Sequence, residues 1–521
     1  MAYHWILRAV MRDADPPLCR CDTMADVAYV GQVANLRRAA SPSAAVSTSP
    51  GQRGWQPRAG WHPAPQRMVI FAALVLTLSV SAQTAKSDEN FRVYTDSPRL
   101  LLTKQRLRLL QRERERASMR WELFDSYVAN GARMPEPGFA WALYYQVARN
   151  TAAGKNAVEW ALGQEADAVA DLRQLALVFD WCGPVMTPEQ TDLLGAKIER
   201  GIGGASQGLT RANEVPRQSA RILAAIAIAD RLKDHGESIL RPVVENWWRG
   251  TLVRQIEAGK PGVPREHIYA FLEMLHALRD NITIDLRESV PAYFQQLPLD
   301  HLTGHYPAPY PGPDNDFMVP VYVRDGNPDL SEAALSRAAG LAMVAYDNNA
   351  VETQYLQGWL LQDHFLMRGP FGIPYEFLWA NPYQPGLSYS LLPLVYHNPA
   401  NGDVFARTSW EEDATWIGYL EGQMQVFRDG KLQAARAGTG TKPVQIGDAL
   451  LMNAPAADSK DGMLHFEAMT EATFVLGLAP RAAYDVEIDD EELAEQETDA
   501  GGTLVIALPA EMQAGVRIKK R

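Results

Sequence analysis

The chain has 521 residues, enough for two or more domains, and 47% of them are hydrophobic, so a sizeable core can form. The formal net charge is −12, with 50 Lys and Arg against 62 Asp and Glu. This charge argues against general nucleic-acid binding, which needs a basic face, and no nucleic-acid partner is expected. Any polyanionic ligand would have to bind in a locally basic cleft.

The first 82 residues have the composition of a leader rather than of a folded domain. Residues 1–67 show little periodicity, and we expect them to be disordered or to belong to an over-extended reading frame. Residues 68–82 are uncharged and end in Val80-Ser81-Ala82, a pattern typical of signal-peptide cleavage. The run is shorter than the about 20 residues that span a bilayer. We therefore predict a periplasmic or secreted protein; the alternative is an uncleaved segment that anchors the chain to a membrane.

The cysteines exclude a disulfide framework. Cys19 and Cys21 lie in the leader, which leaves only Cys182 in the rest of the chain. Two thiols at least are needed for a bridge, so neither a disulfide framework nor a Cys-based metal site is expected, and no metal or cofactor is predicted. Cys182 lies in an apolar stretch and should be a buried small hydrophobe.

Residues 95–398 have the pattern of a helical domain. Val169, Leu172 and Ala176 recur at helical spacing, and Thr187-Pro188 is a typical helix start. There is no fixed repeat, so helical pairs closing into a ring are favoured over a regular solenoid. Further helices are expected near residues 103–129, 239–258, 264–279, 284–296, 331–346 and 351–367.

Two segments rich in Pro, Gly and aromatic residues interrupt the helical pattern. They are 301–313 (HLTGHYPAPYPGP) and 368–389, and we predict irregular loops for both. Such loops either line a binding site or fill an interface between domains. The candidate ligand-contacting residues in and near them are Tyr306, Tyr310, Trp359, Tyr375, Glu376 and Trp379.

Residues 399–521 have the pattern of a β domain. Turn signals such as Arg428-Asp429-Gly430 separate short runs of β-forming residues. We expect two packed antiparallel sheets. The strand candidates are residues 403–407, 415–419, 423–427, 474–478, 483–488 and 504–508.

Three segments resemble those of heparinase II/III-type and alginate-lyase-type polysaccharide lyases. They are 97–103 (SPRLLLT), 171–181 (DLRQLALVFDW) and 403–419 (DVFARTSWEEDATWIGY). The resemblance covers roughly residues 95–480. It implies an incomplete (α/α) toroid of helical hairpins followed by an antiparallel β-sandwich, with a sugar-binding cleft between them. One departure lies at 418–427, where the family usually carries Gly-His-x-His and this sequence has no histidine.

The resemblance also implies a chemistry, β-elimination on uronate-containing glycans. In that reaction one side chain neutralises the carboxylate, and a Tyr or His removes the acidified proton. Asn213 lies where the family places its neutralising residue, with Arg217 one turn further on. Tyr269 follows 56 residues later (269 − 213), and His267 and His305 are further candidates for proton transfer. The implied partner is a polysaccharide.

One predicted helix carries polar residues at intervals of three, four and three. They could do acid–base chemistry if this face lines a cleft; if it faces water they form a solvated stripe, which we favour. A tyrosine base would also need a cation, such as Arg265 or Arg217, to lower its pKa from about 10. The residues are Glu266, Tyr269, Glu273 and His276.

Two other functions stay open. Glu376 and Asp363 could be the paired carboxylates of a glycoside hydrolase, since helical toroids also host hydrolases. The histidine-free segment 418–427 would suit a non-catalytic protein that binds glycans or belongs to the cell envelope. A fold analogy alone does not choose among the three.

Overall fold

The computed structural model describes most of residues 89–521. The chain divides into two units, 1–83 and 84–521, and all described residues belong to the second. The predicted extension and signal segment therefore lie outside the described residues. In the part that is described, no helix is both long and apolar enough to cross a membrane. The gaps are residues 166–168, 208, 211–212, 261, 314, 325, 434–443, 448, 454–462, 469–471, 490, 493–494 and 508–513.

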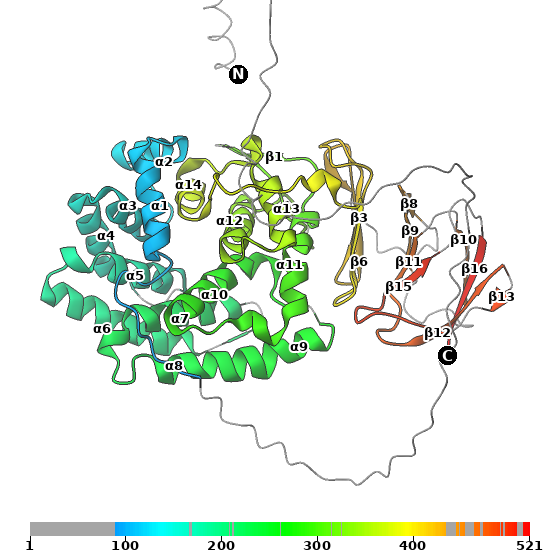
Figure 1. Cartoon of the computed structure of the whole chain (residues 1–521), viewed down its shortest axis with the longest axis horizontal. Helices are drawn as coiled ribbons and strands as arrows, with labels where there is room; N and C mark the ends of the chain where they lie inside the picture. Colours follow the sequence, from blue (N-terminus) through cyan, green and yellow to red (C-terminus); the bar gives the residue numbers. More distant parts are fainter. Residues whose placement is uncertain are drawn as a thin grey trace, which may run out of the picture. The chain divides into compact units, whose positions relative to one another are not determined.

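Six helices form a closed ring, because each contacts the next and the last contacts the first (Figure 1). In order, they are α3 (Pro137–Ala148), α5 (Val169–Trp181), α7 (Glu214–Ala227), α10 (Ile268–Ile282), α12 (Leu330–Tyr346) and α14 (Gly369–Trp379). Other helices pack against this ring: α1 (Lys104–Glu115), α2 (Met119–Ala129), α4 (Thr151–Gly163), α6 (Pro188–Ala205), α8 (Glu237–Pro242), α11 (Pro291–Thr303) and α13 (Val351–Leu360). The short helix α9 (Val253–Glu257) packs instead against the segment that precedes it. A π-helix, Val243–Leu252, joins α8 to α9.

Local sequence explains several helix ends. Thr187 caps α6 by accepting from the Gln190 amide, and the Gln190 side chain accepts from the Thr187 amide in return. This capping box, with Pro188 in the first turn, confirms the predicted helix start. The predicted helix 103–129 is instead two helices, because Ser118 caps a new one after the chain turns at residues 116–118.

The predicted loop 368–389 is wrong in its first half. Residues 369–379 form α14, which completes the ring. Pro370 lies in the first turn, where its missing N–H costs nothing, and the helix also accommodates Pro374 in its interior. Likewise, α11 runs to Thr303, so the first three residues of the predicted loop 301–313 are helical. The predicted helix 284–296 is a short 3₁₀ turn, Leu286–Ser289, followed by α11.

An extended segment before α1 is tied to several distant helices. The Arg99 and Leu100 amides both donate to Asp180 Oδ2 at 2.8 Å. The Val93 amide donates to the His235 carbonyl at 3.1 Å, and Asn281 Nδ2 donates to the Arg99 carbonyl at 3.2 Å. Burial raises the pKa of Asp180 to about 6, although those backbone amides oppose the shift. The segment therefore links α5, α10 and the turn that precedes α8.

Strands follow the ring in three sheets (Figure 1). The first is antiparallel, in the order β3 (Val395–Asn398), β4 (Asp403–Arg407), β5 (Trp416–Leu420), β6 (Gln423–Arg428) and β7 (Lys431–Gln433). The second is β15 (Leu504–Ala507), β11 (Ala472–Leu476), β9 (Ala449–Asn453) and β8 (Val444–Ile446), with β9 and β11 parallel. The third is β10 (Met463–Ala468), β16 (Ala514–Lys520), β12 (Ala483–Ile488) and β13 (Glu491–Glu492), with β14 (Gln496–Glu497) also on β12.

The sheets stack in three layers, because alternate side chains point to opposite faces. Val404 of the first sheet shares a core with Leu451 of the second. The neighbouring residue, Leu450, shares another core with Val486 of the third. The predicted order, helices and then a β-sandwich, is confirmed. The sandwich has a third layer beyond the expected two, because its middle sheet is apolar on both faces.

The outer face of the first sheet packs on the helical region. Phe405 and Trp416 share a core with Tyr306 of the aromatic segment. Beside this core, Arg265 Nη2 lies 3.1 Å from Asp300 and 3.2 Å from Asp403. Burial and the charge of Asp300 raise the pKa of Asp403 to about 7, against the opposing effect of Arg265. Two carboxyl groups thus share one cation where helices and strands meet.

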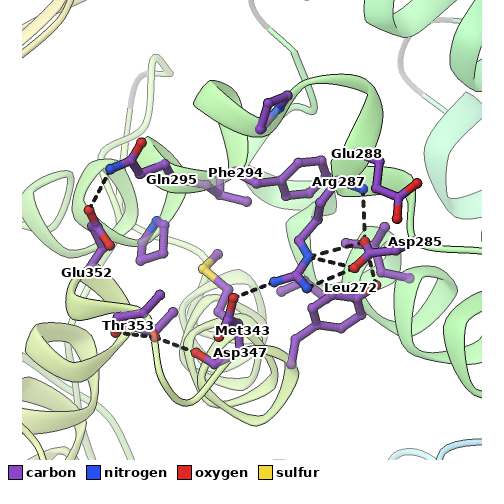
Figure 2. A pocket seen from close by; sticks show the side chains of 16 residues that line it. Leu272, Asp285, Arg287, Glu288, Phe294, Gln295, Met343, Asp347, Glu352 and Thr353 are labelled. Atoms are coloured by element: carbon purple, nitrogen blue, oxygen red, sulfur yellow. Dashed lines mark hydrogen bonds and ion pairs between the residues drawn. The ribbon is translucent and has the colours of Figure 1, made fainter.

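A hollow of about 470 Å³ lies among α10, α11, α12 and α13 (Figure 2). Its floor is apolar, formed by side chains such as Leu275 and Met343. Charged residues including Asp285, Arg287 and Asp347 stand at its edge.

Candidate functional site

A group of polar and aromatic side chains meets inside the helical ring. We call it the ring-centre cluster, and three of the six ring helices contribute to it, together with the residue before a fourth. Glu136 is the residue before α3, Arg173 comes from α5, Tyr269 and Glu273 come from α10, and Tyr375 and Trp379 come from α14. Residues that are separated by up to 243 positions in sequence (379 − 136) therefore form one connected set.

Arg173 holds the cluster together. Its Nε and Nη2 donate to the two carboxylate oxygens of Glu273 at 2.6 and 2.7 Å. Its Nη1 donates to Glu136 Oε1 at 3.2 Å. The bidentate geometry is the strong form of an arginine–carboxylate pair. The Glu273 side chain is fully buried, whereas that of Glu136 keeps 21% of its surface exposed, so solvent reaches the cluster from the Glu136 side.

Tyr269 is fixed by two hydrogen bonds. Its hydroxyl donates to Glu273 Oε1 at 2.7 Å and accepts from Trp379 Nε1 at 3.0 Å. Burial and the Glu273 charge raise the pKa of Tyr269 well above its usual value, and the nearby Arg173 does not offset them. The hydroxyl is therefore protonated at neutral pH, which suits a proton donor better than a base.

The polar face of α10 does not form the solvated stripe that the sequence favours. Tyr269, Glu273 and His276 are buried, and only Glu266 is exposed. The spacing placed these residues correctly on one face. The face points into the ring because α10 contacts α7 on one side and α12 on the other.

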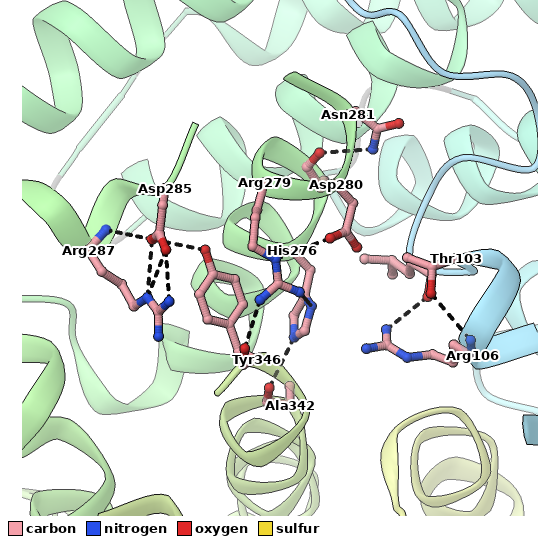
Figure 3. A network of polar contacts seen from close by, with 12 residues as sticks. Thr103, Arg106, His276, Arg279, Asp280, Asn281, Asp285, Arg287, Ala342 and Tyr346 are labelled. Atoms are coloured by element: carbon pink, nitrogen blue, oxygen red, sulfur yellow. Dashed lines mark hydrogen bonds and ion pairs between the residues drawn. The ribbon is translucent and has the colours of Figure 1, made fainter. Parts of the chain in front are cut away.

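A polar network runs along α10 from His276 to Asp285 (Figure 3). Its inner end meets the ring-centre cluster, because the His276 ring packs against that of Trp379 with the ring centroids 4.5 Å apart. His276 Nε2 donates to the Ala342 carbonyl at 3.0 Å, and its Nδ1 accepts from Arg279 Nη2 at 3.3 Å. Arg279 Nη1 donates to the Tyr346 carbonyl at 2.7 Å, and the Tyr346 hydroxyl donates to Asp285 at 3.2 Å. Burial and nearby arginines hold the pKa of His276 well below its usual value, so the ring is neutral.

The predicted neutralising residues lie on α7, a ring helix. The Asn213 carboxamide oxygen accepts from the Thr210 amide at 2.7 Å, so Asn213 does stand at the helix start. Arg217 Nη1 donates to the Gln207 carbonyl at 3.2 Å. Arg221, one turn further, donates to Gln218 Oε1 at 2.8 Å. Burial lowers the pKa of Arg221.

Neither α7 arginine has a carboxylate partner among the described residues. The Nε atoms of both are buried without a hydrogen-bond partner in that part of the chain. The two side chains lie on the side of α7 away from Ile222 and Ile226, which are fully buried. Two adjacent like charges are unfavourable alone, so this pair is suited to bind an anion.

The predicted histidines have different surroundings. His267 is half-buried at the start of α10. His305 is buried; its Nδ1 donates to the His301 carbonyl at 2.6 Å and its Nε2 accepts from Ser336 Oγ at 3.1 Å. Burial holds the pKa of His305 well below its usual value. Both nitrogens of His305 are occupied by these hydrogen bonds, so His305 is poorly placed to remove a proton.

The predicted ligand-contacting aromatics divide into two groups. Tyr375 and Trp379 both reach the ring-centre cluster, where Tyr375 packs edge-on against Tyr269 at 5.0 Å. Tyr306 instead donates to Gln425 at 3.0 Å and stacks on Phe427, so it fills the interface with the first sheet.

Two further predicted contacts lie outside that cluster. Trp359 packs against His305 at 4.9 Å, and Tyr310 forms a short strand pair with Phe317. Glu376 is buried in an ion pair with Arg337 at 3.2 Å, whereas Asp363 is exposed. Glu376 is thus engaged in joining α14 to α12, which weakens the proposed hydrolase pair.

Three residues were not predicted from the sequence as site residues: Glu136, Arg173 and Arg221. Glu136 precedes Pro137, a recognisable helix start, so its position at a helix end was readable. The pairing of Arg173 with Glu273 joins residues 100 positions apart, and no local pattern signals it.

No metal site is evident in the described ranges, where no three His, Cys, Asp or Glu side chains are grouped to hold an ion. Cys182 is buried, and burial raises the pKa of its thiol to about 12, so it is an inert core residue as expected.

Comparisons with known proteins give little. No family model matches the chain, and no curated protein matches it. Solved structures do match, among them a protein described as a glycoside hydrolase, with 11% sequence identity over 74% of this chain and 71% of its own. Its TM-score is 0.27, which carries no argument about fold or function.

Proposed function

We propose that the protein is exported and binds and cleaves a uronate-containing polysaccharide by β-elimination. The observation that carries this proposal is the pair Arg217 and Arg221, which have no carboxylate partner among the described residues. A uronate carboxylate would supply the missing charge. The uncharged run 68–82 supports export.

The residues suit distinct steps of an elimination. Arg217 and Arg221 would neutralise the uronate carboxylate and so acidify the proton at C5. His267, half-buried at the start of the next ring helix, would remove that proton. Tyr269, held in its protonated form, would protonate the oxygen that leaves from C4. One C–H and one C–O bond break, and a C4–C5 double bond forms.

The direct test is ultraviolet absorbance of the unsaturated product, measured with the full chain on alginate, heparan, chondroitin and pectate. We expect absorbance to rise with one of these and to fall at least about tenfold in Arg217→Gln, an effect of roughly 1.4 kcal/mol. The matched control is Arg254→Gln, because Arg254 is exposed on α9. Equal activity in both variants would exclude this role for Arg217.

A second function, glycoside hydrolysis, is favoured by one observation. Glu136 and Glu273 share the guanidinium of Arg173, and one of these carboxylates is buried while the other is partly exposed. Glycosidases usually carry a pair of carboxyl groups in two different environments, one acting as the acid and the other as nucleophile or base. New reducing ends without ultraviolet absorbance, lost in Glu136→Gln, would support hydrolysis instead.

A further inference from the structure

The hollow among α10–α13 is separate from the ring-centre cluster and has no role in the elimination. Its volume of about 470 Å³ is within the usual range for small-molecule sites of roughly 300–1,000 Å³. Leu272, Leu275, Leu297 and Met343 line it, and each is at least nine-tenths buried. A cavity with such a floor favours an apolar group.

The edge of the hollow is charged rather than apolar, and its carboxylates outnumber its cations. Arg287 is the one cation among the lining residues, and it is already paired with Asp285 at 2.8 Å and Asp347 at 2.6 Å. Glu288 and Glu352 also stand at the edge, as Figure 2 shows. The lining therefore carries a formal charge of −3 (one cation and four carboxylates, 1 − 4).

We infer that this hollow is a binding site for a small amphipathic cation, an apolar body with an amine or similar positive group. The apolar body would occupy the floor between α10 and α11, and the positive group would lie at the edge near Glu288, since Glu352 stands on the opposite side of the hollow (Figure 2). An anion of the same size is disfavoured there by four carboxylates, and a neutral molecule gains only from the floor.

Hydrogen bonds also connect the edge of the hollow to the polar network along α10. Asp285 and Arg287 belong both to the edge of the hollow and to the polar network of Figure 3. Asp285 accepts from the Tyr346 hydroxyl, and the Tyr346 carbonyl accepts from Arg279, which in turn bonds His276. A bound cation would thus contact the outer end of a network that reaches the ring centre.

The test compares three probes that share one tail: hexylamine, hexan-1-ol and hexanoate. Calorimetric titration of the full chain at neutral pH should show hexylamine binding with one site per chain and about tenfold or more tighter than hexanoate. Equal affinity for all three, or no heat with hexylamine, would overturn the inference.

Variants locate the binding. Ala350→Phe places a ring at the half-buried edge of the hollow and should abolish hexylamine binding while leaving thermal unfolding unchanged. Glu288→Gln should weaken hexylamine several-fold and leave hexan-1-ol unaffected. Its control is Glu159→Gln, an exposed carboxylate on α4. Unchanged hexylamine affinity in Ala350→Phe would show that the amine binds elsewhere and would refute the site.

Discussion

Two sets of charges on the ring helices differ in one respect, their partners. Arg173 on α5 is matched by two carboxylates, Glu273 and Glu136. Arg217 and Arg221 on the neighbouring α7 are matched by none among the described residues. The first set stabilises the ring by itself. The second lacks a carboxylate partner among the described residues, and under the elimination proposal the substrate carboxylate would supply it.

The largest effect should come from breaking the matched set. Glu273→Ala leaves the Arg173 guanidinium without its bidentate partner in a nearly dry environment. Loss of one member of a buried pair costs about 3–5 kcal/mol. Urea unfolding should show this as a lower midpoint with an unchanged slope.

The control for Glu273→Ala is a substitution at a nearby exposed glutamate, Glu266. Glu266 is exposed, so Glu266→Ala should change the free energy of unfolding by less than about 0.5 kcal/mol. Similar losses in the two variants would mean that the Arg173–Glu273 pair has no special weight.

A smaller loss is expected from Tyr269→Phe. The variant keeps the ring but leaves Trp379 Nε1 buried without an acceptor, at a cost of about 1–3 kcal/mol. Under the elimination proposal it should also abolish product formation, because the proton donor is gone. Urea unfolding together with the absorbance assay separates the two effects: full activity in a destabilised protein would leave Tyr269 a purely structural role.

The carboxyl groups of Asp300 and Asp403, where the first sheet meets the helices, should make the free energy of unfolding depend on pH. Since the pKa of Asp403 is raised from 3.8 to about 7, the folded protein keeps a proton that the unfolded chain releases. The contribution of this group is therefore fully present below pH 3.8 and is lost as pH rises to about 7. Asp403→Asn should flatten this part of the pH profile by at most about 4 kcal/mol, since one unit of pKa corresponds to about 1.4 kcal/mol. A profile identical to that of the unaltered protein would contradict the shift.

The smallest effect on stability should come from substituting Arg217 or Arg221, the pair without carboxylate partners among the described residues. Arg217→Gln and Arg221→Gln relieve the repulsion of two adjacent cations, so unfolding should change by less than about 0.5 kcal/mol or shift towards greater stability. Titration with the substrate found in the absorbance assay should show much weaker binding. A strongly destabilised Arg221→Gln would reveal an internal partner and would remove the contrast between the two sets.

The sequence predicts the order of the elements well, because helical spacing and strand alternation are local signals. Five of the predicted strands overlap β4, β5, β6, β11 and β12, and the predicted strand 504–508 overlaps β15. The third layer was not predicted, because a strand that is apolar on both faces looks the same in two layers as in three.

The candidate site was predicted only in part, and for a physical reason. Spacing put Tyr269, Glu273 and His276 on one face, but polar residues on a helix usually face water. Here they face the inside of a ring, where Arg173 satisfies Glu273. Burial inside a closed ring depends on which helix follows which in space, and that is a long-range property.

The extended segment before α1 has a consequence for the order in which the chain acquires its structure. Arg99 and Leu100 are made early, yet their partners Asp180 and Asn281 come much later, the latter 182 residues after Arg99. During synthesis this stretch can reach Asp180 once α5 is made, but its hydrogen bond to Asn281 must wait until α10 exists. Leu100 and Leu101 are fully buried in the finished protein, so their burial depends on parts of the chain that are made later. The segment that is made first therefore completes its contacts late, and the growing chain must tolerate that delay.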